Sequence, residues 1–312
     1  MTHTLFIDGE AGTTGLEIRQ RLEGRTDLEF ISLTGARRKD PAARAEALNA
    51  ADAVILCLPD DAAKEAVAMI ENPDVRVIDA STAFRVAPGW TYGFPEMDAV
   101  QRGQIVGSRR VSNPGCYPTG FIGLMRPLVK ARLVPADWPV TVNAVSGYSG
   151  GGKSMIAEYE QGEGALAYRA YGLSLRHKHV AEMTRHTGLR HEVLFAPAVG
   201  GYRQGMLVEV PLPLAALPET PSIDRLHGAL LEAYDGCRFV EVAGLDESDA
   251  MAGIDPEGLN GTNTMRLHVF GDRDGCQARL VALLDNLGKG ASGAAVQNLN
   301  LMLGLDEGTG LT

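Results

Sequence analysis

The chain of 312 residues is longer than a single hydrophobic core usually supports, so its length predicts two domains. Hydrophobic residues at 45% and charged residues at 22% are typical of a folded globular protein and exclude a disordered chain. The formal net charge of -10 argues against binding to nucleic acid or to a membrane surface, because both require a basic face.

The first 115 residues alternate between apolar strands and helices. The chain opens with a strand at Thr4–Ile7, a glycine-rich turn and an amphipathic helix whose apolar positions include Leu16, Ile18 and Leu22. Further strands are predicted at 28–33, 52–59 and 75–81, and further helices at 41–51 and 60–70. Strands this apolar, each followed by a helix, pair in parallel and are buried on both faces. We therefore predict a Rossmann-type, doubly wound α/β domain over residues 1–115.

From Cys116 onward the pattern changes to strands with fewer helices between them. These strands are predicted at 140–147, 191–199, 205–213, 238–243 and 264–271. We expect mixed or antiparallel pairing, which predicts a second, α+β domain over residues 116–285. In the final segment, 286–312, small residues precede a helix with apolar positions at Ala295, Val296, Leu299, Leu301 and Met302. We expect this helix to return to the first domain and complete it.

The first turn between strand and helix carries a candidate cofactor loop. Gly9, Gly12 and Gly15 form a G-x-x-G-x-x-G pattern, with Thr13 and Thr14 inside it. Glycine allows the backbone to turn tightly, to approach a pyrophosphate and to present the N–H groups of a helix to it. The pattern alone is a weak signal, and its place at the first strand-to-helix turn strengthens it. The alternative is a glycine turn that binds no ligand.

The end of the second strand indicates which dinucleotide is bound. An NAD enzyme usually carries Asp or Glu there for the ribose hydroxyl, whereas this chain has Arg37, Arg38 and Lys39. Guanidinium groups suit a 2'-phosphate, so the sequence favours NADP. The alternative is a solvated basic turn.

Cys116 lies in the stretch SNPGCYPTG, between one turn and the start of another element. Pro118 suits the first turn of a helix, where its missing N–H costs little. The thiol is therefore expected at a helix N-terminus, where the dipole and free N–H groups stabilise a thiolate and can bind an oxyanion. This environment is typical of a nucleophile. A small buried apolar residue is the alternative, and it is the better interpretation for Cys57 inside its apolar strand.

A thiolate that works with a nicotinamide cofactor indicates chemistry at an acyl or aldehyde carbon. Sulfur forms a thioester or thiohemiacetal, hydride moves between that carbon and the cofactor, and an acid/base group must move protons. His177 and His179 are the candidates, because they cluster with charged residues in the stretch RHKHVAEM. At a helix entry Glu182 would lie one turn from His179, close enough to orient its ring.

The sequence predicts no metal and no disulfides. His-x-His has no third ligand close in sequence, and the four cysteines show no C-x-x-C spacing. The N-terminal stretch has no signal-peptide pattern, and no run of about 18 apolar residues occurs. We therefore expect a protein of the reducing cytoplasm.

Taken together, these motifs resemble the N-acetyl-gamma-glutamyl-phosphate reductases in their shorter form, and the resemblance covers essentially the whole chain. Its strongest element is SNPGCYPTG, which is similar to the active-site cysteine signature of that family. The other stretches that carry it are DGEAGTTGLE, IDASTAFR, YGFPEM, HKHVAEM and DNLGKGASGAAVQNLN. The resemblance implies NADPH-dependent reduction of an N-acetyl-glutamyl acyl phosphate to the semialdehyde, with release of phosphate, in arginine biosynthesis.

The resemblance also implies roles for particular residues. Cys116 would be the nucleophile, and His177 or His179 the acid/base, with Glu182 and Tyr171 in support. The family usually has Pro where this chain has Ala181, which leaves the choice between the two histidines open. For the remaining roles, the phosphate would be held by Arg85, or by Arg109 or Arg110, the substrate would meet a loop at Ser146 and Gly147, and the nicotinamide side would be approached by Asn286, Gly288 and Gly290.

Two alternatives remain open. Aspartate-semialdehyde dehydrogenase shares the two-domain plan and the cysteine chemistry, but it has Asn before the cysteine where this chain has Gly115. The second is a non-catalytic NADP-binding sensor, in which Cys116 would only pack in a turn. In either of the enzyme interpretations the resemblance implies a homo-oligomer, a dimer or tetramer formed through the sheet of the second domain.

Overall fold

The computed structural model describes residues 2–162, 165–272 and 276–312. The chain forms two compact units, which are described separately. The first comprises Met1–Pro95, Val100–Gly115 and Ala291–Thr312, and the second comprises Glu96–Ala99 and Cys116–Gly290. Among the described residues, no helix combines the length and apolar character needed to cross a membrane.

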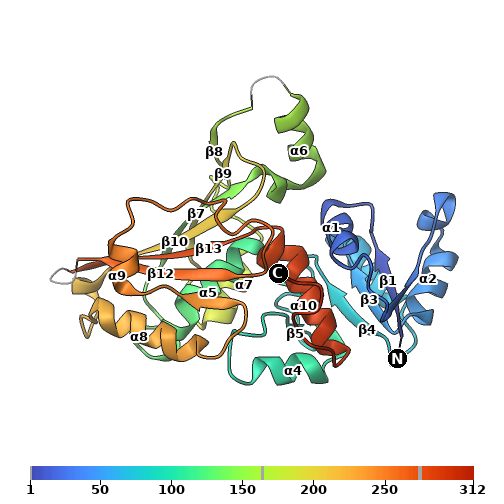
Figure 1. Ribbon diagram of the computed structural model, residues 1–312, viewed down its shortest axis with the longest axis horizontal. Helices are drawn as coiled ribbons and strands as arrows, with labels where there is room; N and C mark the ends of the chain where they lie inside the picture. Colours follow the sequence, from blue (N-terminus) through green and yellow to red (C-terminus); the bar gives the residue numbers. More distant parts are fainter. Residues whose placement is uncertain (1, 163–164, 273–275) are drawn as a thin grey trace. The chain divides into compact units, whose positions relative to one another are not determined.

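The first unit is built on a six-stranded sheet of order β2-β1-β3-β4-β6-β5 with parallel pairing throughout (Figure 1). Its strands are β1 (His3–Asp8), β2 (Leu28–Ile31), β3 (Ala53–Leu56), β4 (Arg76–Asp79), β5 (Thr91–Tyr92) and β6 (Arg110–Ser112). Its helices are α1 (Thr13–Arg21), α2 (Pro41–Ala50), α3 (Asp60–Ala68), α4 (Gln101–Gly107) and α10 (Gly293–Met302), with a 3-10 turn η1 (Gly35–Lys39).

Alternate residues along the central strands explain why helices cover both faces of this sheet. Leu5 and Ile7 pack in one cluster with residues of α1, α4 and α10, whereas Phe6, between them, packs in another with residues of α2 and α3. A strand that is apolar at every position buries both of its faces, so the predicted doubly wound α/β class is confirmed. One detail of the prediction is wrong: Leu16 is 51% exposed, because Ile18 and Leu22 alone carry the contact of α1 with the sheet.

Helix α10 belongs to the first unit although it lies at the end of the chain. Ala295, Val296, Leu299, Leu301 and Met302 are all buried in the same cluster as Ile18 and Leu22 of α1. Before it, a single turn of π-helix, η4 (Gly288–Ser292), connects α10 to the last strand of the second unit.

The second unit holds a seven-stranded mixed sheet of order β11-β12-β13-β10-β7-β9-β8. Its strands are β7 (Thr141–Gly147), β8 (Tyr168–Ala170), β9 (Leu194–Gly200), β10 (Met206–Pro213), β11 (Val240–Val242), β12 (Met265–Gly271) and β13 (Gln277–Leu284). Its helices are α5 (Cys116–Lys130), α6 (Gly152–Gln161), α7 (Val180–Thr187), α8 (Ile223–Tyr234) and α9 (Leu245–Asp249), with 3-10 turns η2 (Tyr148–Gly151) and η3 (Leu214–Ala216).

Helix α5 packs against β10 and β13, and α8 packs against β12, on one face of this sheet (Figure 1). The pairs β7–β9 and β11–β12 are parallel and the others antiparallel, which confirms the predicted mixed pairing. The prediction missed β8 and β13. Strand β13 is central, and its apolar run carries no alternation by which a strand is told from a short buried helix.

Candidate active site

The glycine loop of the first unit fits the backbone so closely that side chains are excluded. Gly9 has φ +86°, and a Cβ on it would lie 2.3 Å from the carbonyl oxygen of Cys57. A Cβ on Gly15 would lie 2.7 Å from the carbonyl oxygen of Gly9. Gly12 precedes the first residue of α1 and donates its N–H to the Gly9 oxygen at 2.9 Å. The free N–H groups at the start of α1 therefore lie open to an anion.

A cavity of about 390 to 470 Å³ scale is typical of small-ligand sites, and one of 470 Å³ lies beside this loop. Its lining includes Gly9, Ala11, Arg38 and Lys39. Arg38 also donates to the carbonyl of Leu33 at 3.0 Å, which fixes its side chain at the end of the β2 segment. The glycine cradle and these two cations suit the phosphates of a dinucleotide.

Two further predicted cofactor residues are placed differently by the structure. Arg37 forms an exposed ion pair with Glu46 at 3.3 Å and does not line the cavity. Thr13, the first residue of α1, has a buried Oγ1 that finds no hydrogen-bond partner among the described residues, whereas Thr14 is half-buried. An orphaned buried hydroxyl at the loop is consistent with a missing ligand.

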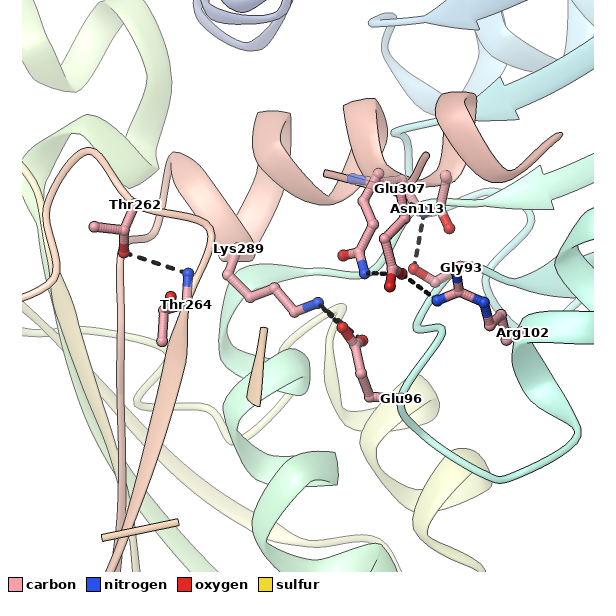
Figure 2. Close-up of polar contacts among 10 residues, drawn as sticks. Gly93, Glu96, Arg102, Asn113, Thr262, Thr264, Lys289 and Glu307 are labelled. Atoms are coloured by element: carbon pink, nitrogen blue, oxygen red, sulfur yellow. Dashed lines mark hydrogen bonds and ion pairs between the residues drawn. The ribbon is translucent and has the colours of Figure 1, made fainter. Parts of the chain in front are cut away.

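The loop before the cysteine is held by Asn113. Its backbone N–H donates to the Asp79 carbonyl at 2.7 Å, and its Nδ2 donates to the Ala291 carbonyl at 2.9 Å. Asn298 of α10 donates from Nδ2 to Asn113 Oδ1 at 3.1 Å and to the Gly93 carbonyl at 2.8 Å (Figure 2). Asn113 is 1% exposed, so these hydrogen bonds are shielded from water and fix the entry to Cys116.

The predicted arginines lie at opposite edges of the parallel sheet. Arg85 follows β4 at its carboxyl end, is 8% exposed, and donates to the carbonyls of Asn113 at 3.0 Å and Ala80 at 3.1 Å. Arg110 begins β6 and donates to the Val75 carbonyl, which precedes β4, at 2.8 Å. Arg109 reaches Asp74 at that same edge. Because Gly9 also follows its strand, Arg85 alone of the three shares the edge of the cofactor loop.

Cys116 is the first residue of α5, where the sequence pattern predicted a helix start. Pro118 lies in the first turn, and the helix then runs through a buried apolar stretch. Gly290 lies against the cysteine: a Cβ on residue 290 would be 2.8 Å from the Cys116 Cβ and 3.3 Å from its Cα. Cys116 is half-buried and forms no disulfide.

Both candidate histidines pack around the ring of Tyr117, which follows the cysteine. The ring centroid of Tyr117 is 6.4 Å from that of His177 and 6.0 Å from that of His179. Tyr171 donates its hydroxyl to the Tyr117 hydroxyl at 3.3 Å, and Tyr117 donates to the Ala198 carbonyl at 3.0 Å. Burial raises the pKa of Tyr171 to about 12, so this hydroxyl stays protonated at neutral pH. The fold thus brings Cys116, Tyr171 and both histidines to one region of the second unit.

The two histidines differ in their surroundings. Burial, with a smaller effect of Lys178, lowers the pKa of His177 to about 4. The backbone N–H of His179 donates to Nδ1 of His177 at 3.2 Å, so a neutral His177 carries its proton on Nε2. His179 caps α7, is 7% exposed, and places Nε2 3.9 Å from Oε1 of the buried Glu182. Glu182 thus lies one helical turn from His179, where its carboxylate stabilises a positive ring.

The predicted substrate loop lies at the carboxyl end of β7. Ser146 is 1% exposed and donates its hydroxyl to the Gly147 carbonyl at 3.2 Å. A Cβ on Gly147 would lie 2.5 Å from the backbone of Arg203, so glycine is required there. Asn286 accepts the Gly205 N–H at 2.8 Å and donates to Ser149 Oγ at 2.9 Å, which braces the loops after β7 and before β10.

Comparison with known proteins identifies the family. The family model described as "Semialdehyde dehydrogenase, NAD binding domain" matches residues 6–105, and the one described as "Semialdehyde dehydrogenase, dimerisation domain" matches residues 116–286. The N-acetyl-gamma-glutamyl-phosphate reductase of Chelativorans sp. is 56% identical over 97% of this chain and 99% of its own. A reductase of the same name from Pseudomonas putida is 54% identical over 97% of each chain.

The chain belongs to the N-acetyl-gamma-glutamyl-phosphate reductase family. The resemblance inferred from its motifs is thereby confirmed. Solved structures support the fold of this reductase-family chain: an aspartate semialdehyde dehydrogenase from Francisella tularensis covers 97% of this chain and 100% of its own with a TM-score of 0.72 at 14% identity. An aspartate semialdehyde dehydrogenase with NADP from Candida albicans gives a TM-score of 0.66, also at 14% identity.

Some residues of this reductase-family chain that shape the site were missed from sequence. Arg44 on α2 lines the cavity and pairs with the buried Asp8 at 2.8 Å. No sequence signal links the two residues, because a contact between positions 8 and 44 exists only once β1 and α2 have packed. Tyr117 was within reach, since it adjoins Cys116 in the signature. Within the described residues, no group of three metal-binding side chains occurs.

Proposed function

We propose that this protein reduces N-acetyl-L-glutamyl 5-phosphate to N-acetyl-L-glutamate 5-semialdehyde with NADPH, as a cytoplasmic enzyme of arginine biosynthesis. The observation that carries the proposal is Cys116 at the first residue of α5, with Tyr117 packed between the two histidines, in a chain 54–56% identical to reductases of that name. Cysteine at a helix start, with histidines nearby, is the equipment for nucleophilic acyl chemistry.

The first unit would hold the cofactor. The N–H groups at the start of α1, behind Gly9, Gly12 and Gly15, would meet its pyrophosphate, and Arg38 would meet the 2'-phosphate, with Lys39 beside it. Thr13 and Thr14 would contact the same phosphates. NADPH bound there would supply the hydride that reduces the acyl group. Arg37 pairs with Glu46, so we assign it no direct role, and contact of Asn286 with the nicotinamide stays a prediction.

Cys116 would attack the acyl carbon of the substrate as a thiolate. The C–S bond forms while the bond from carbon to the phosphate oxygen breaks, and inorganic phosphate leaves with that electron pair. The free N–H groups of the first turn of α5 favour negative charge on sulfur and on the carbonyl oxygen as it becomes an oxyanion. After hydride reaches the thioester carbon, the C–S bond breaks, and the aldehyde and the thiolate are released.

We assign the acid/base role to His179. The imidazolium that forms when it accepts a proton is stabilised by the Glu182 carboxylate 3.9 Å away. His177, with a pKa near 4, is a poor base but a stable neutral donor through its Nε2 proton. It would therefore donate a hydrogen bond to the substrate oxygen, with Tyr171 supporting the group through the Tyr117 hydroxyl.

Anionic groups of the substrate require fixed cations and dipoles. We propose that Arg85 meets the phosphate, because its guanidinium is bidentate in shape and lies after β4 at the carboxyl edge. Ser146 and Gly147 would line the pocket for the acetylglutamyl part. Arg110 lies at the amino edge of the sheet and is not carried into the proposed site.

The second unit would also mediate self-association. Helices cover one face of its sheet, and the opposite face displays Asn143, Ala196, Glu209 and Arg279 around hollows of 390 and 630 Å³. Leu173 and Leu175 are 82% and 53% exposed at the edge of the first hollow. We propose a homo-oligomer, a dimer or tetramer, formed through this face.

The reaction is tested in reverse, as phosphate-dependent reduction of NADP+ by N-acetyl-glutamate semialdehyde, in wild type and Cys116→Ala. We expect turnover of the acetylated substrate alone and its loss, by about 10⁴-fold or more, in the variant. Aspartate semialdehyde serves as the competing substrate. Preference for it would reject the proposed substrate, and turnover that survives in Cys116→Ala would reject the mechanism.

A further inference from the structure

Lys289 and Glu96 form an ion pair inside the second unit. The Lys289 ammonium lies 2.7 and 2.8 Å from the two carboxylate oxygens of Glu96 (Figure 2). The side chains are 1% and 6% exposed, and the ammonium also lies 5.7 Å from the centroid of the Phe239 ring. Lysine is almost never buried to this degree unless it is paired, and such a pair gains little net stability over an apolar one. Stability alone therefore does not account for it.

The pair holds the turn that lies against the cysteine. Lys289 belongs to the π-helical turn Gly288–Ser292, and its neighbour Gly290 is the residue whose Cα approaches Cys116. Glu96 belongs to the short segment Glu96–Ala99, which the chain contributes to the second unit from within the sequence of the first. The charges thus connect two segments that are 193 residues apart.

The rest of the turn is equally constrained. The Gly290 N–H donates to the Asp285 carbonyl at 2.9 Å. A Cβ on Gly288 would lie 2.1 Å from the Thr262 carbonyl oxygen, so the backbone there is packed tightly as well. Asp285, 0% exposed, accepts from Gln204 and Gly261 at 2.6 and 2.9 Å. With one end of the turn fixed by Asp285, the Lys289 side chain determines how closely its middle approaches Cys116.

We propose that Lys289 and Glu96 are positioning residues for the Cys116 thiol. The Gly290 backbone is a wall on one side of the Cys116 Cβ, so it restricts the rotamers of the side chain and directs Sγ toward the free N–H groups of α5. Without the pair the turn relaxes and Sγ samples orientations that are not productive. This inference rests on the proposed role of Cys116 as the nucleophile.

The test compares Lys289→Met, the double variant Lys289→Met/Glu96→Leu and the control Lys130→Met. Lys130 lies at the far end of α5 and pairs with Asp98 of the same Glu96–Ala99 segment, but it is 65% exposed. Each protein is assayed for kcat, KM and melting temperature. The rate of alkylation of Cys116 by iodoacetamide is followed against pH on the peptide that contains it.

We expect Lys289→Met to lower kcat by about 10²-fold with little change in KM, as misplacement by about 1 Å does. Its alkylation profile should shift to higher pH, because the thiolate loses contact with the helix N–H groups. The double variant buries no unpaired charge, so it should recover the melting temperature without recovering kcat or the profile. Lys130→Met should match wild type.

The proposal is overturned if the double variant recovers kcat and the alkylation profile together with its melting temperature, since the pair would then be structural only. It is equally overturned if Lys289→Met keeps the wild-type kcat and profile. Should Lys289→Met not fold, the double variant decides. Cys116→Ala separates the two proposals: turnover that persists in it rejects the proposed function, and the alkylation profile still judges the positioning role.

Discussion

Neighbouring residues of one type acquire different chemistry from their surroundings. His177 and His179 are two positions apart, yet burial keeps His177 neutral while His179 lies beside the Glu182 carboxylate. Desolvation disfavours a charged ring, and a nearby negative charge favours it. The two rings are 4.7 Å apart between centroids, so this division of roles arises within one small cluster.

The assignment of His179 predicts a specific loss of activity. His179→Gln should lower kcat by about 10² to 10⁴-fold, the usual contribution of an acid/base group. Glu182→Gln should lower kcat less and should alter its pH dependence, because the carboxylate acts through the ring. The kcat values against pH for both variants check this, and full activity of His179→Gln would transfer the role elsewhere.

The lowered pKa of His177 predicts a pH dependence of stability. The unfolded chain binds the His177 proton as pH falls through its ordinary value of 6.5, whereas the folded protein resists it until about pH 4. The free energy of unfolding contributed here is therefore present above 6.5 and is lost as pH falls toward 4.

His177→Asn should remove this loss while keeping an acceptor for the His179 N–H. Urea unfolding at pH 7.5 and 4.5 measures it, and the variant should lose less stability between the two values than wild type. His191→Asn, at an exposed position, is the control. Equal losses in His177→Asn and wild type would show that the ring is not desolvated.

At the scale of elements, the chain places its chemistry where a strand ends and a helix begins. Gly9 follows β1 before α1, and Cys116 follows β6 as α5 begins. Strand ends in a parallel sheet meet at one edge, and helix starts carry unpaired N–H groups, so both junctions favour anions. The loops between are fixed by hydrogen bonds such as those of Asn113, which keep that arrangement rigid.

The junction of β1 and α1 offers a matched comparison of glycines. Gly9 and Gly24 both have positive φ, +86° and +78°, but only a Cβ on Gly9 would meet backbone, whereas the space around Gly24 is open within 4 Å. Gly24→Ala should cost about 1 kcal/mol of stability through its backbone conformation alone. Gly9→Ala should cost more and should also weaken NADP binding.

Thermal unfolding and titration with NADP measure the two effects. Equal destabilisation by Gly9→Ala and Gly24→Ala, with unchanged cofactor affinity, would contradict the close fit of the loop to the Cys57 carbonyl.

At the scale of the whole molecule, the second unit leaves one face of a seven-stranded sheet without helices. Exposed apolar side chains at its edge, Leu173, Leu175 and Tyr168, are a reason to expect a protein partner, because contiguous apolar surface is uncommon on monomers. The family model described as a dimerisation domain matches this unit.

Self-association through this face predicts a change of mass in solution. Leu173→Arg should shift the protein toward the monomer in light scattering coupled to gel filtration, because a charge would be buried at the interface. Leu231→Arg, on α8 and 46% exposed, is the matched control and should leave the mass unchanged. A wild-type monomer, or an unchanged mass in Leu173→Arg, would reject this face as the interface.

The sequence by itself determined the elements and the chemistry-bearing motifs. Alternation of apolar strands with helices specified the doubly wound sheet, and turn residues around Gly9 and Cys116 marked the two junctions, because these signals are local in the chain. Strand β13 escaped prediction for the same reason, since an unbroken apolar run has no local period.

Only the tertiary structure decided which of these residues act together. Asp8 with Arg44, Asn113 with Asn298, and Lys289 with Glu96 are pairs distant in sequence, and each forms only after its elements have packed. Packing likewise placed Arg85 and Arg110 at opposite edges of one sheet and gave the two histidines different surroundings. Burial and long-range contact set charge and orientation, and neither quantity is written in the order of the residues.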